Sequence, residues 1–144
     1  MKKLFAVAVV VLACAGISFA GEATPARISL FPPLSAPSLK TVHGLDLGIF
    51  ATEVDEVQGL QLCLIYASAE KKMVGVQYGA IANISKDDAK GVQLGFYNSA
   101  KNMTGLQLGF INVADSLKGL QVGLVNIINT GAPLKFMVIA NAHF

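Results

Sequence analysis

Apolar and polar residues alternate strictly in short stretches from residue 44 onward. In residues 105–112, Leu106, Leu108 and Phe110 fall on one side of an extended chain, and Gln107 falls on the other. A two-residue period is that of a β-strand, because successive side chains point to opposite faces, and no helical spacing competes with it. The pattern therefore predicts an all-β chain whose strands carry a leucine face and a glutamine face.

The alternating stretch recurs as one five-residue phrase, whose copies begin with glycine at intervals of 15, 16, 16, 14 and 14 residues. The copies are Gly44-Leu45-Asp46-Leu47-Gly48, Gly59-Leu60-Gln61-Leu62-Cys63, Gly75-Val76-Gln77-Tyr78-Gly79, Gly91-Val92-Gln93-Leu94-Gly95, Gly105-Leu106-Gln107-Leu108-Gly109 and Gly119-Leu120-Gln121-Val122-Gly123. A fixed short period indicates one small unit built repeatedly, with each copy resting on its neighbours. We therefore expect a β-repeat domain over residues 44–144, with a degenerate last strand after Gly131-Ala132-Pro133.

Two arrangements of tandem strand-turn units satisfy this pattern. The first is an antiparallel meander or a small closed barrel of about eight strands, which abolishes free sheet edges. Its strands are the six copies, the last unit and a short strand at residues 27–31. Glycines in every strand suit tight curvature. We favour this arrangement, with successive copies packed through the leucine face.

The alternative is a parallel β-solenoid with one repeat per coil. In-register stacking then forms ladders of side-chain amides, with Met103 and Leu117 as a second inward side. The ladders would contain Gln77, Gln93, Gln107 and Gln121, and likewise Asn98, Asn112 and Asn126. The apolar last strand counts against a solenoid, because such a stack usually needs a polar cap.

Residues 1–20 have the parts of a signal peptide. Lys2 and Lys3 precede an apolar run over residues 4–13, and Ser18 and Ala20 are small residues at the positions that a signal peptidase reads. At roughly ten strongly apolar residues, the run is short against the about 20 that a spanning helix needs. We therefore expect an exported protein of the periplasm, the outer membrane or the cell surface.

A second interpretation of the N-terminus places a lipid anchor there. Val11-Leu12-Ala13-Cys14 loosely resembles a lipobox, which would make Cys14 a lipidated N-terminus, but the apolar stretch continues to Phe19 and argues against it. Cleavage after Ala20 leaves 124 residues, enough for one domain. Residues 21–43 then form an N-terminal strand and a proline-rich connector, in which Pro32-Pro33 ends the strand.

The charge balance excludes one class of partner. The chain has 11 basic and 9 acidic residues, and without Lys2 and Lys3 the basic count falls to nine, which makes the exported part neutral. Nucleic-acid binding therefore has no electrostatic support. Nearly all the remaining charges lie in short polar segments between the strands, which we expect to be solvated turns. Cys63 stands where other copies have glycine and is expected to be a small buried filler.

Candidate catalytic and metal-binding residues are few. His43 and His143 are the only histidines, at opposite ends of the repeats with no carboxylate beside them, and they make a weak site. The acidic segment Glu53-Val54-Asp55-Glu56 lacks the glycines and spacing of a calcium loop. Asp87-Asp88 lies between lysines and is typical of a neutralised turn.

The glycine-rich phrase is not a phosphate-binding loop, because it lies within an alternating strand with no helix after it. We therefore predict no catalytic, cofactor-binding or metal-binding residue, no identifiable small-molecule substrate and no enzymatic activity. The apolar residues at the seventh repeat position form a stripe that is either a partner surface or a second core. This stripe contains Phe50, Ile65, Ile81, Tyr97, Ile111, Val125 and Ile139.

The units at residues 91–98, 105–112 and 119–126 resemble the repeats of bacterial exported surface-repeat proteins. Each unit reads glycine, an apolar residue, glutamine, an apolar residue, glycine, two apolar residues and asparagine. The resemblance covers about residues 44–126 and departs at Cys63, where glycine is expected, and at Ala51, Tyr66 and Ala82, where asparagine is expected. That family is functionally uncharacterised, so the resemblance implies export and a repeat architecture but no catalytic residues.

These observations predict a non-enzymatic exported envelope protein, a structural or interaction module built from β-repeats. Its expected partners are the outer membrane or another envelope protein, contacted through an apolar repeat face. The alternative is a small outer-membrane β-barrel that binds or passes an apolar ligand. Only three consecutive face positions per copy are reliably apolar, whereas a membrane-spanning strand of about 9–11 residues needs four or five.

Overall fold

The computed structural model describes residues 23–31, 34–36 and 39–144, so the predicted signal peptide, Cys14 and Pro32-Pro33 lie outside the described residues. The described residues form nine strands, and none lies in a helix long and apolar enough to cross a membrane. The strands are β1 (Thr24–Phe31), β2 (Leu34–Ala36), β3 (Thr41–Gly48), β4 (Ala51–Cys63), β5 (Tyr66–Gly79), β6 (Ala82–Leu94), β7 (Tyr97–Leu108), β8 (Ile111–Thr130) and β9 (Phe136–His143).

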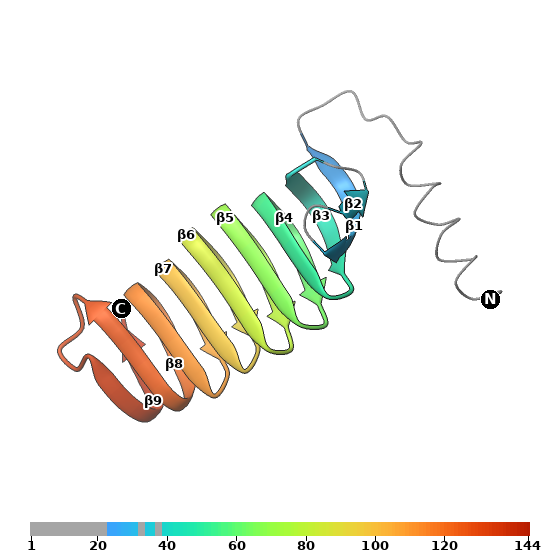
Figure 1. Ribbon diagram of the computed structural model, residues 1–144. Coiled ribbons are helices and arrows are strands. Elements are labelled where there is room, and N and C mark those ends of the chain that lie inside the picture. The colour runs from blue at the N-terminus through green and yellow to red at the C-terminus, as the bar shows by residue number, and fades with distance from the viewer. Residues whose placement is uncertain (1–22, 32–33, 37–38) are drawn as a thin grey trace.

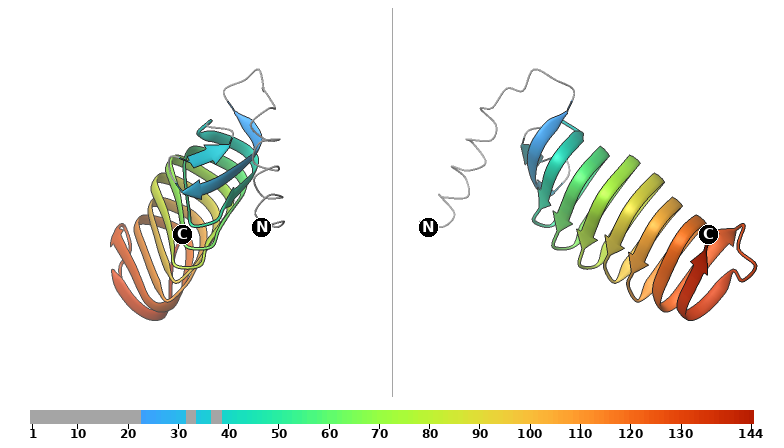
Figure 2. Two further views of the ribbon diagram at one scale, coloured as in Figure 1. Left: turned by 45° about the vertical axis from the view of Figure 1, so that its right-hand side comes forward. Right: turned by 180° about the vertical axis from the view of Figure 1, so that it is seen from behind.

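The strands wind into a parallel β-solenoid (Figures 1 and 2). Strands β3 to β8 pair in parallel and in chain order, and β2 and β9 lie at the two ends of the nine-stranded sheet. The sheet therefore does not close on itself. The favoured prediction, an antiparallel meander or barrel, is wrong, and the alternative, a parallel solenoid with one repeat per coil, is confirmed.

The pairing register explains why the copies stack in parallel. Gly59, Gly75, Gly91 and Gly105 are each paired with the equivalent glycine of the next coil, and the glutamines two residues later are paired in the same way. Only parallel, in-register copies set identical residues side by side along the whole stack. An antiparallel meander would reverse every second copy and separate the glutamines from one another.

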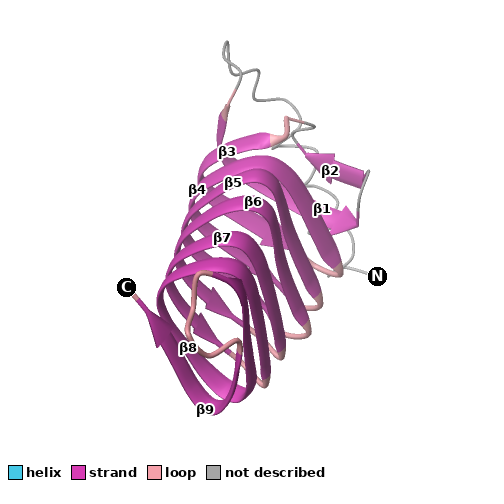
Figure 3. Ribbon diagram, turned by 90° about the vertical axis from the view of Figure 1, so that its left-hand side faces the viewer, coloured by secondary structure: helices cyan, strands magenta, loops and turns pink. Residues whose placement is uncertain are grey.

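Each coil has two edges (Figure 3). The first is the turn edge, defined here by Phe50, Ile65, Ile81, Phe96, Phe110 and Leu124. One strand ends and the next begins at the first five, and Leu124 is the equivalent position inside β8. The second is the charged edge, defined by Asp55, Glu70, Lys71, Lys86, Asp87, Lys101 and Asp115. The polar segments predicted as turns are therefore bends inside the long strands, and the strand breaks are the apolar turns opposite them. Register shifts at Val54/Glu56 and Ser85/Asp88 absorb length differences at the charged edge.

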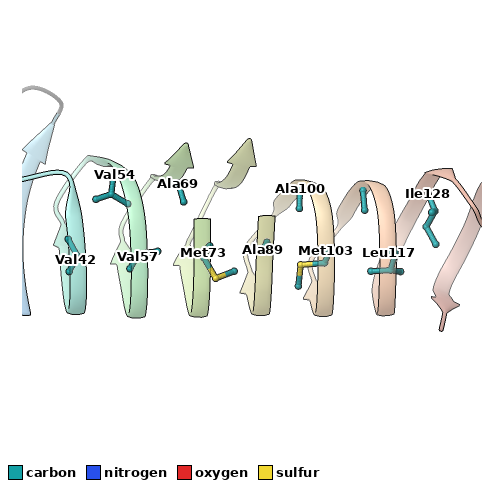
Figure 4. Close-up of a cluster of buried hydrophobic side chains, with 11 residues drawn as sticks. Val42, Val54, Val57, Ala69, Met73, Ala89, Ala100, Met103, Leu117 and Ile128 are labelled. Carbon is teal, nitrogen blue, oxygen red and sulfur yellow. The ribbon is translucent and has the colours of Figure 1, made fainter. Parts of the chain in front are cut away.

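The interior behind the charged edge is apolar. Its side chains flank the charged bends in the sequence and form one double row along the stack, in which side chains from the two sides of the coils face each other (Figure 4). Met103 and Leu117 belong to this row, as predicted for the solenoid, and both are almost fully buried. The row consists of Val42, Val54, Val57, Ala69, Met73, Ala89, Ala100, Met103, Ala114, Leu117 and Ile128.

The interior behind the turn edge is polar, and this corrects the predicted core. Gln61, Gln77, Gln93, Gln107 and Gln121 are completely buried, whereas Leu106 and Leu108 are partly exposed and Leu120 is exposed. The leucine face is therefore an outer surface. The cause is the narrow coil, in which side-chain amides bond along the stack and glycines leave room for them.

The two ends of the stack are closed differently. At the N-terminal end β1 pairs in parallel with β3 and antiparallel with the short β2. At the C-terminal end β9 turns back and pairs antiparallel with β8, setting Asn141 opposite Gln121, and Ala132 packs against the apolar interior. The predicted last strand is confirmed, and a reversed apolar strand takes the place of the polar cap that a solenoid was expected to need.

Candidate interaction surface

The glutamine ladder is the internal scaffold of the stack. Each Nε2 donates to the Oε1 of the glutamine one coil nearer the N-terminus, at 2.8 Å from Gln77 to Gln61, 2.8 Å from Gln93 to Gln77 and 2.7 Å from Gln107 to Gln93. Gln121 continues the ladder to Gln107 at 2.7 Å. Because a buried amide without a partner is costly, this ladder fixes both the register and the parallel direction of the coils.

An asparagine ladder lies across the interior from the glutamines and runs in the opposite sense. Asn83 Nδ2 donates to Asn98 Oδ1 at 2.8 Å, Asn98 to Asn112 at 2.8 Å, and Asn112 to Asn126 at 2.9 Å. Counting from Gly75 places the asparagine of this copy at Ala82, but Asn83 is the residue that pairs with Asn98. The difference arises because the turn of this copy is one residue longer than those of the later copies. The asparagine therefore persists in that copy and is only shifted by one residue in the sequence.

A buried ionic cluster closes the glutamine ladder at its N-terminal end. Asp46 replaces glutamine in the first copy, and its Oδ2 accepts hydrogen bonds from Thr52 Oγ1 at 2.5 Å and Gln61 Nε2 at 3.0 Å. Arg27 of β1 lies with Nη1 3.9 Å from Asp46 Oδ1 and donates to the Glu53 carbonyl at 2.7 Å. The ladder thus presents its amide N–H end to a carboxylate, a favourable pairing of dipole and charge.

Burial dominates the titration of this cluster. Burial raises the pKa of Asp46 above its ordinary value, although the Thr52 hydroxyl, Arg27 and Gln61 act in the lowering direction. Burial also lowers the pKa of Arg27, against the charges of Asp46 and Glu53. The pair is nearly inaccessible, so its geometry serves to end the ladder and offers no reacting group to a substrate.

The raised pKa of Asp46 predicts a pH-dependent stability. The folded protein takes up a proton at a pH where the unfolded chain has already lost it, so the stability contributed by this group falls as pH rises from 3.8 through the raised value. We expect the free energy of unfolding of the wild type, minus that of Asp46→Asn, to increase on acidification from pH 7 toward 3.8. Urea unfolding of both proteins at several pH values measures this difference in free energy. A difference that stays constant or decreases on acidification contradicts the prediction.

The histidines considered from the sequence do not come together. His43 lies in β3 near the N-terminal end of the stack, and His143 lies in β9 at the other end. His143 Nδ1 is 2.9 Å from the Leu117 carbonyl oxygen. A closed barrel would have brought the two ends of the repeats together, and the solenoid separates them along its full length.

Three of the acidic candidates, Asp55, Asp87 and Asp88, face lysines or amides of neighbouring coils. Lys71 Nζ lies 3.0 Å from Asp55 Oδ2, Lys86 Nζ lies 2.8 Å from Glu70 Oε2, and Lys101 Nζ lies 3.4 Å from Asp87 Oδ1. Asn102 Nδ2 donates to Asp88 at 2.9 Å. Within residues 23–31, 34–36 and 39–144, no group of three or more histidine, cysteine or acidic residues is arranged to hold a metal ion.

Cys63 is buried, as predicted, and its thiol donates to the Phe50 carbonyl at 3.2 Å. The Arg27–Asp46 cluster was missed in the sequence because parallel pairing of β1 with β3 joins residues far apart in the chain. The sequence feature that could have indicated the cluster is Asp46 itself, because it places a charge at the repeat position where the other copies have glutamine. The amide ladders and this cluster lie inside the stack, and the outer surface is the part of it that a partner can contact.

The turn edge is an exposed apolar feature that runs along the repeats. Its six side chains are between 39% and 57% exposed, and the Phe96 and Phe110 rings stack with centroids 4.8 Å apart. Backbone hydrogen bonds tie the turns together, at 3.2 Å from Tyr66 N to the Phe50 carbonyl and 2.9 Å from Val125 N to the Phe110 carbonyl. The edge is therefore a continuous apolar row whose linked backbone groups are already paired.

The predicted apolar stripe divides between two positions. Phe50, Ile65 and Ile81 lie on the turn edge. Tyr97, Ile111 and Val125 each come directly after a turn-edge residue and are half-buried. Ile139 lies apart from both, on β9, and is 71% exposed. The stripe is thus neither a second core nor a single row, and the turn edge is the part of it that a partner can reach.

Comparison of the chain with protein-family models, curated proteins and solved structures gave no match in any of the three.

Proposed function

We propose that this protein is a non-enzymatic exported envelope protein that acts as a structural or interaction module. The observation that supports the proposal most directly is the partial inversion of the fold, with amides inside behind the turn edge and leucines, phenylalanines and isoleucines on the outer surface there. A scaffold of paired backbone and amide ladders is rigid, and its outer apolar surface is available to a partner. The predicted signal peptide supplies the argument for export.

The proposal keeps one half of the alternative function. A small outer-membrane barrel that binds or passes an apolar ligand required a closed sheet and an apolar contact surface. The solenoid has no closed sheet, but its exposed turn edge supports apolar binding. We therefore place the binding surface on the outside of the stack and propose no passage through it.

Fractionation of the native host tests this function. We expect the protein in the envelope fraction, with residues 1–20 removed, because the short apolar run and small residues at its end are typical of a cleaved signal. Recovery in the cytosol with residues 1–20 intact would contradict the proposal. A variant with Leu4, Val7 and Val10 changed to aspartate is the control, since a broken apolar run should retain the protein in the cytosol.

A further inference from the structure

We propose that the turn edge binds a lipid bilayer surface edge-on, with the charged edge directed into water. This inference rests on the proposed envelope location and names the partner of the same apolar surface. Its starting point is the row of six turn-edge side chains, which come from successive coils. The turns of these coils follow one another along the stack (Figure 1). Neighbouring coils are about 4.8 Å apart, so one plane touches all six turns over roughly 25 Å.

The turns contain no charged residue at all. Residues 48–50, 63–66, 79–81, 95–97, 109–111 and 123–125 are glycine, alanine, cysteine, tyrosine and larger apolar residues only. The six turn-edge side chains expose about 500 Å² of apolar surface, which lies at the upper end of what a monomeric protein exposes in one patch. Such a row is unfavourable in water unless something covers it.

Backbone pairing makes the turn edge compatible with lipid. Ile111 N donates to the Phe96 carbonyl at 3.0 Å, and Tyr97 N donates to the Ile81 carbonyl at 2.9 Å, so the peptide groups of these turns bond to the next coil. In a bilayer, unpaired N–H and carbonyl groups are costly because no water reaches them. A protein partner would instead need hydrogen bonds at the interface, and this edge has few groups left to offer.

The leucine face changes from apolar to charged with distance from the turn edge. On the leucine face Leu106 and Leu108 lie nearest the turn, and exposed Lys90 and Lys118 lie nearest the opposite edge. At that edge, lysines and carboxylates of neighbouring coils neutralise one another. This gradient is typical of an amphipathic element lying in a membrane interface.

All three tyrosines of the chain flank the turn edge. Tyr66 and Tyr97 begin the strands that follow a turn, and Tyr78 lies on the leucine face just before one, with 41% of its surface exposed. Tyrosine is enriched where a membrane meets water, because its ring is apolar and its hydroxyl is polar. The tyrosines therefore mark the expected depth of insertion on both faces.

Binding to lipid vesicles tests the inference. The protein is purified from its host in the form that remains after any processing there. The probe is large unilamellar vesicles of phosphatidylcholine alone, because the contact is with acyl chains and needs no anionic headgroup. We expect the wild type to co-sediment with vesicles and Phe110→Asp to bind about tenfold or more weakly. Ser116→Asp adds the same charge at an exposed position on the opposite side of the coil and should bind within about twofold of the wild type.

A second pair of variants keeps the test decisive if Phe110→Asp does not fold. The chain has no tryptophan, so Phe110→Trp and Ser116→Trp each carry a single reporter. Tryptophan emission should shift to the blue on vesicles for Phe110→Trp and stay unchanged for Ser116→Trp. Equal binding of Phe110→Asp and the wild type, or an unshifted Phe110→Trp, would overturn the inference.

Two further outcomes separate this inference from the proposed function. A wild type that sediments without lipid as an oligomer, and becomes monomeric as Phe110→Asp, shows that the turn edge binds a second copy and overturns lipid binding. An envelope-located protein that does not bind vesicles also overturns the inference while the proposed function stands. A cytosolic protein, in contrast, contradicts the proposed function whatever the vesicle result.

Discussion

Replacing Gln107 with leucine is expected to lower the free energy of unfolding by about 2–5 kcal/mol, since each buried polar group that loses its partner costs about 1–3 kcal/mol. Gln107→Leu removes the donor to Gln93 Oε1 and the acceptor of Gln121 Nε2. The substituted side chain has a similar volume, so the loss reports hydrogen bonding rather than a cavity. Urea unfolding followed by circular dichroism measures it.

The matched control is the reverse exchange one residue away. Leu108 points outward and is partly exposed, so Leu108→Gln should change the free energy of unfolding by about 1 kcal/mol or less. A fold with a leucine core requires the opposite order, in which Gln107→Leu is tolerated and Leu108→Gln is strongly destabilising. That result would remove the amide-filled interior on which the proposed function depends.

Gly105→Ala is expected to destabilise the protein by about 3 kcal/mol or more, because backbone strain combines with a collision. Gly105 has a φ of 132°, a conformation that residues with a side chain rarely adopt. A Cβ there would also overlap the carbonyl oxygen of Gly91 in the neighbouring coil. The coil could accept it only by moving away from its neighbour, which would lengthen the hydrogen bonds of both ladders.

Gly131→Ala separates strain from collision. Gly131 has a φ of 86°, but the nearest atom to an added Cβ is His143 Cε1 at 3.7 Å, an ordinary contact. We expect a loss of about 1–2 kcal/mol, the cost of a left-handed conformation alone. Thermal unfolding of both variants measures the difference, and equal losses would show that the repeated glycines serve conformation only and not the close approach of coils.

Local alternation was sufficient to predict the strands but not their stacking. The two-residue period of residues 105–112 predicts a strand whichever of its two faces is buried. We expected the apolar leucine face to be the buried one, and that expectation was wrong. A signal for the correct choice was present. Glutamine is unchanged in five of the six copies, whereas the flanking apolar positions vary among leucine, valine and tyrosine. A position that must bond to its own copy tolerates less variation than one that faces outward.

The candidate surface was predictable in part for a related reason. Phe50, Ile65 and Ile81 were recognised as an apolar stripe, but counting from each leading glycine assigned Tyr97 to the same row in place of Phe96. The turns of the first three copies are one residue longer, and only the paired register shows it. The Arg27–Asp46 cluster was unpredictable for a different reason, because it depends on which strand β1 joins.

The opposite directions of the two amide ladders have a consequence for chain length. Glutamine N–H groups point toward the first coil and asparagine N–H groups toward the last, so their dipoles oppose each other along the axis. Copying a 14-residue unit would therefore extend the protein without building up a field at its tips. Gene duplication can change the reach of such a molecule while its two closing segments stay as they are.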